Sequence, residues 1–292
     1  MSTPQLGKIA CVTVSAADLD ACERAYSRNF DYRVSEKSVV SETQASLWNT
    51  PGMVGAKTLI MEPASGNDFV FRFIERPSDP DYQPLTTWGW NAAEVLVENV
   101  DALAAQLIDD DFKILGEPKN LSFTDDIRAM QLRGPANEIL YMTELKAPIP
   151  GMDLPTATSF VDNTFIVILG GGDISAMMQS YQQQFGIAPA PVMESRITVA
   201  SRAFGLSIEH RYPIAALGIK DQCMIEVDEL PAQAGPRQTE AGLLPPGISM
   251  VSFRCTTAPD ESAAECTGLP YRGHKASCTS GAAGELIELI HI

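Results

Sequence analysis

A pattern of six residues occurs twice in this chain, and the two copies are separated by a constant offset. The first copy is Asp18, Leu19, Tyr26, Phe30, Asp31 and Tyr32, and the second is Asp173, Ile174, Tyr181, Phe185, Gly186 and Ile187. Each copy follows an apolar, strand-like run, at 9–14 and at 164–169. Self-similarity at a fixed spacing marks a repeated structural unit, so we expect a fold built by duplication.

The composition limits the partners of the chain. Its 292 residues are enough for about two domains of ordinary size. The formal net charge of −16 makes nucleic acid and anionic membranes unfavourable partners. The sequence has no apolar run of membrane-spanning length and no signal peptide pattern at its start. We therefore expect a cytoplasmic protein that acts on a small-molecule substrate, and the sequence leaves homo-oligomer formation open.

Strand-like and helical patterns divide the chain into four modules. Each begins with a strand and continues through a helix into further strands, although the fourth has only one helical turn, near 261–266. A linker at 147–155, rich in Pro and Gly, predicts a boundary between domains 1–146 and 156–292. The predicted modules are 8–76 and 86–146, then 163–230 and 247–292. We assume that module 1 pairs with module 2 and module 3 with module 4.

This arrangement resembles the vicinal oxygen chelate superfamily, which includes glyoxalase, bleomycin resistance and type I extradiol dioxygenase proteins. The resemblance rests on the strand followed by Asp-Leu or Asp-Ile, the helical Tyr and Phe, and the closing GAAGELIEL. It implies an α+β fold of four βαβββ modules paired into two domains, each a cup of curled mixed sheets with helices outside. The order of modules resembles the extradiol dioxygenases, which implies an active site in the second domain.

In this superfamily the first and last strands of two modules place four residues in one cup, where they ordinarily bind a divalent metal through His, Glu or Gln. Counting from the motifs gives Cys11, Arg72, Ala92 and Leu140 for the first cup, and Ile166, Glu226, Met250 and Glu288 for the second. Neither set contains histidine, so we expect no conventional metal site. An iron, manganese or zinc ion, if bound, would use Glu288, His274 and Glu226.

Two carboxylates facing each other in a cup can perform acid–base chemistry. If Glu226 and Glu288 share the second cup, burial and mutual repulsion raise the pKa of at least one of them. Such a pair suits proton transfer next to a carbonyl group. Both residues alternate with apolar neighbours, however, so the pattern equally fits the solvated face of a strand.

Other polar residues complete the predicted site. His274, in PYRGHKAS, resembles the histidine before the terminal Glu of the ring-cleavage signature, and His210 and Tyr212 lie in a segment that resembles the one carrying an acid–base histidine. We predict these three as proton relays, although each histidine also fits a structural or surface role. Arg254 is a predicted substrate anchor because its planar fork matches a carboxylate. Met250 and Ile166 are predicted to contact the substrate.

The leading functional hypothesis is an enzyme of this superfamily with a degenerate metal site. It would act as an isomerase, epimerase or lyase on a small oxygenated metabolite, of which aromatic compounds are one class. One alternative is a binding protein that sequesters a small molecule in its cup without catalysis. A second is a metal-dependent extradiol dioxygenase with shifted ligands.

Overall fold

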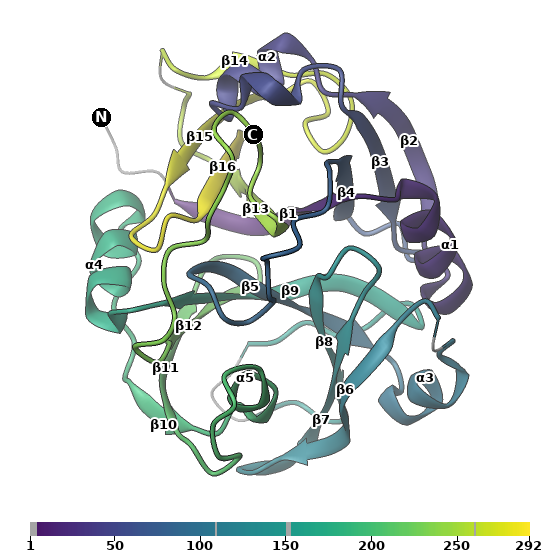
Figure 1. Ribbon diagram of the computed structural model, residues 1–292, viewed down its shortest axis with the longest axis vertical. Helices are drawn as coiled ribbons and strands as arrows, with labels where there is room; N and C mark the ends of the chain where they lie inside the picture. The colour runs from purple at the N-terminus through teal and green to yellow at the C-terminus, as the bar shows by residue number, and fades with distance from the viewer. Residues whose placement is uncertain (1–4, 109, 150–152, 260) are drawn as a thin grey trace.

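The computed structural model describes residues 5–108, 110–149, 153–259 and 261–292 (Figure 1). The first half of the chain contains two modules, in the order β1(Leu6–Ala16), α1(Leu19–Phe30), β2(Arg33–Val39), α2(Glu42–Leu47), a 3-10 turn (Pro51–Met53), β3(Lys57–Glu62), β4(Val70–Glu75), and then β5(Gly89–Val97), α3(Val100–Gln106), β6(Lys113–Leu121), β7(Thr124–Arg133), β8(Ile139–Leu145). No helix in these ranges is long and apolar enough to cross a membrane.

The second half repeats this order with a shorter last module. It runs β9(Val161–Gly171), α4(Ile174–Phe185), β10(Met193–Ser195), α5(Thr198–Ala203), β11(Tyr212–Gly218), β12(Met224–Glu229), and then β13(Gly247–Cys255), β14(Ala264–Glu265), β15(Lys275–Ser280), β16(Leu286–His291). The helical turn predicted near 261–266 is wrong, because a turn and the two-residue β14 occupy the described part of that segment.

The repeated six-residue pattern defines the ends of α1 and α4. Asp18 and Asp173 are the N-caps, and their side chains accept hydrogen bonds from the backbone N–H three residues on. Asp31 and Gly186 are the C-caps and adopt the left-handed conformation, with φ of 57° and 67°, which Gly and Asp tolerate best. The duplication predicted from the sequence therefore corresponds to two equivalent helices with equivalent ends.

The strands form two mixed, eight-stranded sheets, as the predicted α+β fold requires. Modules 1 and 4 form the terminal sheet, with strand order β14-β15-β16-β13-β1-β4-β3-β2, and modules 2 and 3 form the central sheet, with order β10-β11-β12-β9-β5-β8-β7-β6. Each sheet is joined at its middle by an antiparallel pair, β1 with β13 and β5 with β9. Within each module the first and last strands are parallel.

The assumed pairing of module 1 with module 2, and of module 3 with module 4, is therefore wrong. Each sheet combines one module from each half of the chain. The linker at 147–155 joins β8 to β9, which lie in the same sheet, and its residues 150–152 fall outside the described ranges. Backbone hydrogen bonding between strands does not depend on side-chain identity, so alternation along a strand does not reveal which module supplies the neighbour.

The two sheets pack back to back around a shared core. Alternate residues of the first strands, such as Val12 and Val14 on β1 and Val167 and Leu169 on β9, are buried in this core. Their neighbours face the opposite, concave side of each sheet. We call these concave faces the terminal cup and the central cup; α2 lies over the first, and the central sheet curls around α5 (Figure 1).

The modules that we assumed to pair contact each other through helices: α1 of module 1 contacts module 2, and α4 of module 3 contacts module 4. The hydroxyl of Tyr26 on α1 donates a hydrogen bond of 2.9 Å to Glu138, in the turn before β8. Tyr181 on α4 interacts with Glu285, in the equivalent turn before β16, more weakly: the distance and angle at its hydroxyl do not meet those of a hydrogen bond. Burial raises the pKa of both Glu138 and Glu285 to about 7.

We predict that Tyr26→Phe lowers the free energy of unfolding by about 1–3 kcal/mol, because Glu138 stays buried without one of its donors. Tyr181→Phe is the matched control and should change stability much less. Urea unfolding of both variants tests this, and equal losses would contradict the assigned hydrogen bond.

Candidate functional site

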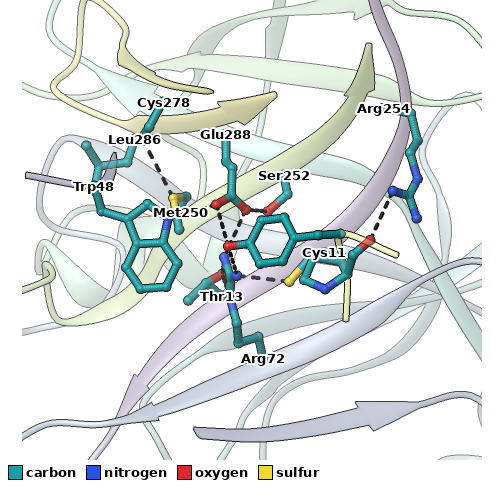
Figure 2. A network of polar contacts seen from close by, with 12 residues as sticks. Cys11, Thr13, Trp48, Arg72, Met250, Ser252, Arg254, Cys278, Leu286 and Glu288 are labelled. Atoms are coloured by element: carbon teal, nitrogen blue, oxygen red, sulfur yellow. Dashed lines mark hydrogen bonds and ion pairs between the residues drawn. The ribbon is translucent and has the colours of Figure 1, made fainter. Parts of the chain in front are cut away.

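The terminal cup holds a buried ion pair where the superfamily pattern places metal ligands. Arg72 on β4 donates to Glu288 on β16 at 3.0 Å, and both side chains are at most 1% exposed. Arg72 also donates to the hydroxyl of Thr13 on β1, at 3.0 and 2.8 Å. The four central strands of the terminal sheet thus converge on one guanidinium and one carboxylate (Figure 2).

The Glu288 carboxylate is fully occupied by donors. Besides Arg72, it accepts from the indole N–H of Trp48 at 2.7 Å, from the hydroxyl of Tyr271 at 2.8 Å and from the hydroxyl of Ser252. The Arg72 guanidinium carbon lies 4.7 Å from the centroid of the Trp48 ring, a cation–π geometry. Burial works against the charged guanidinium, but Glu288 and Tyr271 raise the pKa of Arg72 above its ordinary value.

These contacts close the terminal cup. Trp48 follows α2 directly and is 2% exposed, and Tyr271 is fully buried. Cys11 and Met250, the other two positions expected to line a cup, are also fully buried. The chain therefore fills this cup with its own side chains and neutralises the carboxylate internally.

Strand register identifies the equivalent positions in the central cup. Thr13 pairs with Arg72 across β1 and β4, and Ile168 pairs with Glu226 across β9 and β12. Glu226 thus takes the place of Arg72.

The strands of modules 4 and 2 supply the remaining equivalent positions. Ser252 pairs with Glu288 across β13 and β16, whereas Glu94 pairs with Tyr141 across β5 and β8. Where the terminal cup has Arg, Ser and Glu, the central cup therefore has Glu, Glu and Tyr.

The carboxylates of the central cup lack cationic partners. Glu94 accepts a hydrogen bond of 2.6 Å from Thr143, while Glu226 makes no hydrogen bond or ion pair within the described ranges. Asp228 lies two residues beyond Glu226 on the same face of β12. It is 4% exposed, and its Oδ1 has no hydrogen-bond partner.

Burial and mutual repulsion act on these acids together. Burial, and then the charge of Glu226, raise the pKa of Glu94 to about 8 against a weaker opposing effect of the Thr143 hydrogen bond. Burial raises the pKa of Glu226 to about 7 and, with Glu226, raises that of Asp228 well above its ordinary value. Burial, followed by these three acids and Tyr212, also raises the pKa of Tyr141.

Solvent reaches the central cup, in contrast to the terminal one. Glu94, Glu226 and Tyr141 are all half-buried, although the strands that carry them are largely buried. Phe204 follows α5 as Trp48 follows α2, with nearly the same backbone conformation (φ −85° against −84°), yet Phe204 is only half-buried. The equivalent aromatic residue therefore does not seal the central cup.

The structure separates the predicted catalytic pair. Glu288 lies in the terminal sheet and Glu226 in the central sheet, so the expectation that they face each other in one cup is wrong. His274 is exposed in the turn before β15. His210 is also exposed, and its ring contacts the edge of Tyr212 with centroids 4.7 Å apart.

The remaining predicted residues divide between the two cups. Tyr212 and Ile166 lie in the central sheet, where the Tyr212 hydroxyl is 3.1 Å from the hydroxyl of Ser201 on α5. Met250 packs with Trp48 in the terminal sheet. Arg254 is held by both carboxylate oxygens of Asp68, at 3.0 and 2.7 Å, so it is not free to clamp a substrate.

The residues present do not fit a bound metal. The Arg72 guanidinium lies at the centre of the terminal cup, where it would repel a cation. The suggested ligand set of Glu288, His274 and Glu226 is dispersed over both sheets and the surface. Across the described ranges, no three His, Cys, Asp or Glu side chains are arranged to hold a metal ion.

Sequence reasoning missed Glu94, Tyr141 and Asp228. Glu94 interrupts an otherwise apolar strand in NAAEVLV, which is a usable signal, and Asp228 shares the alternation of Glu226. The assumed module pairing hid them, because it placed β5 and β8 in a different cup from β9 and β12. Only the observed pairing brings these strands together.

Two surface clefts lie away from these residues. One, of about 560 Å³, lies between α2 and the β14–β15 region, and Glu42, Leu47 and Cys278 are among its lining residues. The other, of about 730 Å³, lies beside the start of α1. Both lysines that line the second cleft are paired with carboxylates of the same cleft, Lys37 with Glu23 and Lys57 with Glu75.

We predict that Glu288→Gln lowers the free energy of unfolding by about 3–5 kcal/mol, because it leaves the buried Arg72 charge without its counter-ion. Trp48→Phe keeps the ion pair but removes one hydrogen bond to the same carboxylate, part of the buried ring and part of its contact with Arg72, and should cost about 1–3 kcal/mol. Denaturant unfolding measures both values. A loss below about 1 kcal/mol in Glu288→Gln would show that the ion pair does not support the fold.

The pKa of Glu94 predicts a pH dependence of stability. Its folded pKa of about 8 lies above the ordinary value of 4.5, so between these values the folded protein keeps a proton that the unfolded chain has released. The free energy of unfolding therefore falls as pH rises through this window. The facing groups are Glu226 and Asp228 on β12, Tyr141 and Thr143 on β8, and Tyr212 on β11.

Urea unfolding between pH 5 and pH 9 checks this dependence. Glu94→Gln should reduce the fall, whereas the exposed Glu117→Gln on β6 should leave the wild-type profile intact. Part of the fall remains in both variants because Glu138 and Glu285 also have raised pKa values. Identical profiles for Glu94→Gln and wild type would show that folding does not raise the pKa of Glu94.

Known proteins resemble this chain in structure but not in sequence. No family model matches the sequence, and a search of curated proteins finds no match. Among solved structures, a single-residue variant of glyoxalase I from Zea mays is similar over 97% of this chain and 93% of its own, with a TM-score of 0.61 and 15% identity.

A second solved structure gives the same picture. A protein from Bacillus subtilis, provisionally assigned as a dioxygenase, is similar over 98% of this chain and 86% of its own, with a TM-score of 0.59 and 10% identity. These identities establish the fold and not the activity. The chain therefore has the fold of the vicinal oxygen chelate superfamily, as its repeated sequence pattern predicted.

Proposed function

We propose that this protein is an acid–base enzyme whose active site is the central cup. It would transfer protons next to a carbonyl group of a small oxygenated metabolite, as isomerases, epimerases and lyases do. One observation carries the proposal: two half-buried carboxyl groups, Glu94 and Glu226, interact electrostatically in one cup and have pKa values near neutrality.

The contacts of the two acids assign their roles. Glu94 is fixed by its hydrogen bond from Thr143, whereas Glu226 has no partner among the described residues and can accept a proton. The pKa values of both are raised toward neutrality, so that one can hold a proton while the other is ionised. Acid–base catalysis is most effective when the pKa lies near the working pH. Because the two groups interact, they titrate as a pair, and ionisation of one raises the pKa of the other.

The surroundings support this use of Glu226. Among the described residues its carboxylate has no hydrogen-bond or ion-pair partner. It can therefore accept a proton from a substrate without first breaking an ion pair. Ile166 supplies an apolar wall on β9, and Tyr141 places a phenol on β8. Glu288, in contrast, is saturated by four donors and is not available for proton transfer.

The leading alternative is a binding protein that uses the same cup without catalysis. The missing histidines favour it, because His210 and His274 are exposed and His291 is held by Ser277 and the carbonyl of Thr257. A metal-dependent dioxygenase lacks support, because the residues present do not fit a metal.

Proton transfer can be tested without knowing the natural substrate. We would incubate small α-hydroxy ketones and α-hydroxy aldehydes with the protein in D2O and follow exchange of the hydrogen next to the carbonyl by NMR. We expect exchange that Glu226→Gln abolishes and that Glu94→Gln reduces at least tenfold.

Glu117→Gln is the matched control, because it changes the same side-chain type at an exposed position of the central sheet and should exchange like wild type. Compounds that bind in the central cup without exchanging would favour the binding protein. Exchange that survives Glu226→Gln would contradict the proposed role of Glu226.

A further inference from the structure

The terminal cup shows which group this chain uses to satisfy a cup carboxylate. There, the guanidinium of Arg72 contacts Glu288 at 3.0 Å and lies against the ring of Trp48. The group is planar, cationic and surrounded by carboxylate and aromatic surfaces, which is the usual setting of a buried guanidinium.

The central cup has the carboxylates without this cation. By strand register, Glu226 stands at the position equivalent to Arg72, and Glu94 at the position equivalent to Ser252. Within the described ranges, no Lys, Arg or His forms an ion pair with Glu94, Glu226 or Asp228. The nearby Arg202 on α5 is exposed and donates to the carbonyl of Leu115 instead.

A buried polar atom provides independent support for a missing ligand group. Asp228 is 4% exposed, points to the same side of β12 as Glu226, and leaves its Oδ1 without a hydrogen-bond donor. A buried carboxylate oxygen without a donor is costly. A ligand bearing several N–H donors would supply what the protein does not.

The rest of the cup selects the kind of cation. The acids are not arranged to coordinate a metal ion, whereas half-buried Tyr141 and Met224 offer an aromatic and an apolar surface beside them. This combination suits an organic cation with an apolar body. The net charge of −16 also attracts cations and repels anions at long range.

We infer that the ligand of the central cup carries a guanidinium, amidinium or ammonium group on an apolar body, and that this group contacts the cup carboxylates as the Arg72 guanidinium contacts Glu288 in the terminal cup. The inference rests on the central cup being the functional site, and it names the substrate class of that site. It excludes carboxylate and phosphate compounds as the main ligands.

Three probes of nearly the same shape test the charge preference. Benzamidine is cationic, benzamide is neutral and benzoate is anionic, and binding of each is measured by titration calorimetry at pH 8. We expect benzamidine to bind at least tenfold more tightly than benzamide, and benzoate not to bind detectably. Binding of benzamidine should strengthen between pH 6 and pH 8.5 as the cup acids ionise.

Variants locate the binding. Glu226→Gln should weaken benzamidine binding at least tenfold and should fold, because it neutralises an unpaired, half-buried acid. Glu117→Gln should bind like wild type, and thermal unfolding of both variants confirms that they are folded. Three results would each overturn the inference. Benzamidine does not bind at millimolar concentration, or the three probes bind equally, or Glu226→Gln leaves the affinity for benzamidine unchanged.

Two further outcomes separate this inference from the proposed function. Selective benzamidine binding that depends on Glu226, without hydrogen exchange on any compound, keeps the inference and contradicts proton transfer. Hydrogen exchange on neutral compounds without any preference for benzamidine keeps the enzyme and overturns the cationic ligand. Stoichiometric binding of Zn²⁺ or Mn²⁺ that Glu226→Gln abolishes would replace the organic cation with a metal.

Discussion

The antiparallel pairing of β1 with β13 is the contact on which this architecture depends. It joins the first module to the last one across most of the chain. Once these strands pair, modules 2 and 3 are left to pair through β5 and β9, and the two sheets meet back to back. The concave faces are then on opposite sides of the shared core (Figure 1), so the chain has two independent cups.

The two cups have the same backbone plan and opposite electrostatics. In the terminal cup, the Arg72–Glu288 pair and Trp48 satisfy every charge and exclude water. In the central cup, Glu94 and Glu226 stay half-buried with raised pKa values and no counter-ion. The ion pair of the terminal cup is internal and serves the fold, whereas the acids of the central cup have no cationic partner among the described residues, and we propose that they act on a ligand from solution.

Several features of the site could be predicted from the sequence. The Asp that precedes α1 fixed the count that reached Cys11 on the first strand, and the closing motifs of the modules gave Arg72, Glu226 and Glu288 on last strands. All four residues face a cup. The roles of these residues were less accessible. Whether a Glu accepts four hydrogen bonds, as Glu288 does, or none, as Glu226 does, depends on groups that are far away in the chain, such as Trp48 and Tyr271.

The sequence by itself determined the local units: four modules, the capped helices, the alternation that separates core from cup, and the superfamily fold. These features depend on residues that are close in sequence, because helix caps and side-chain alternation are set within a few residues. Only the tertiary structure decided which modules share a sheet, and therefore which acids share a cup. The reason is that backbone hydrogen bonds between strands are the same whichever strand is the partner. Which modules pair therefore depends on how all four modules bury their apolar faces together.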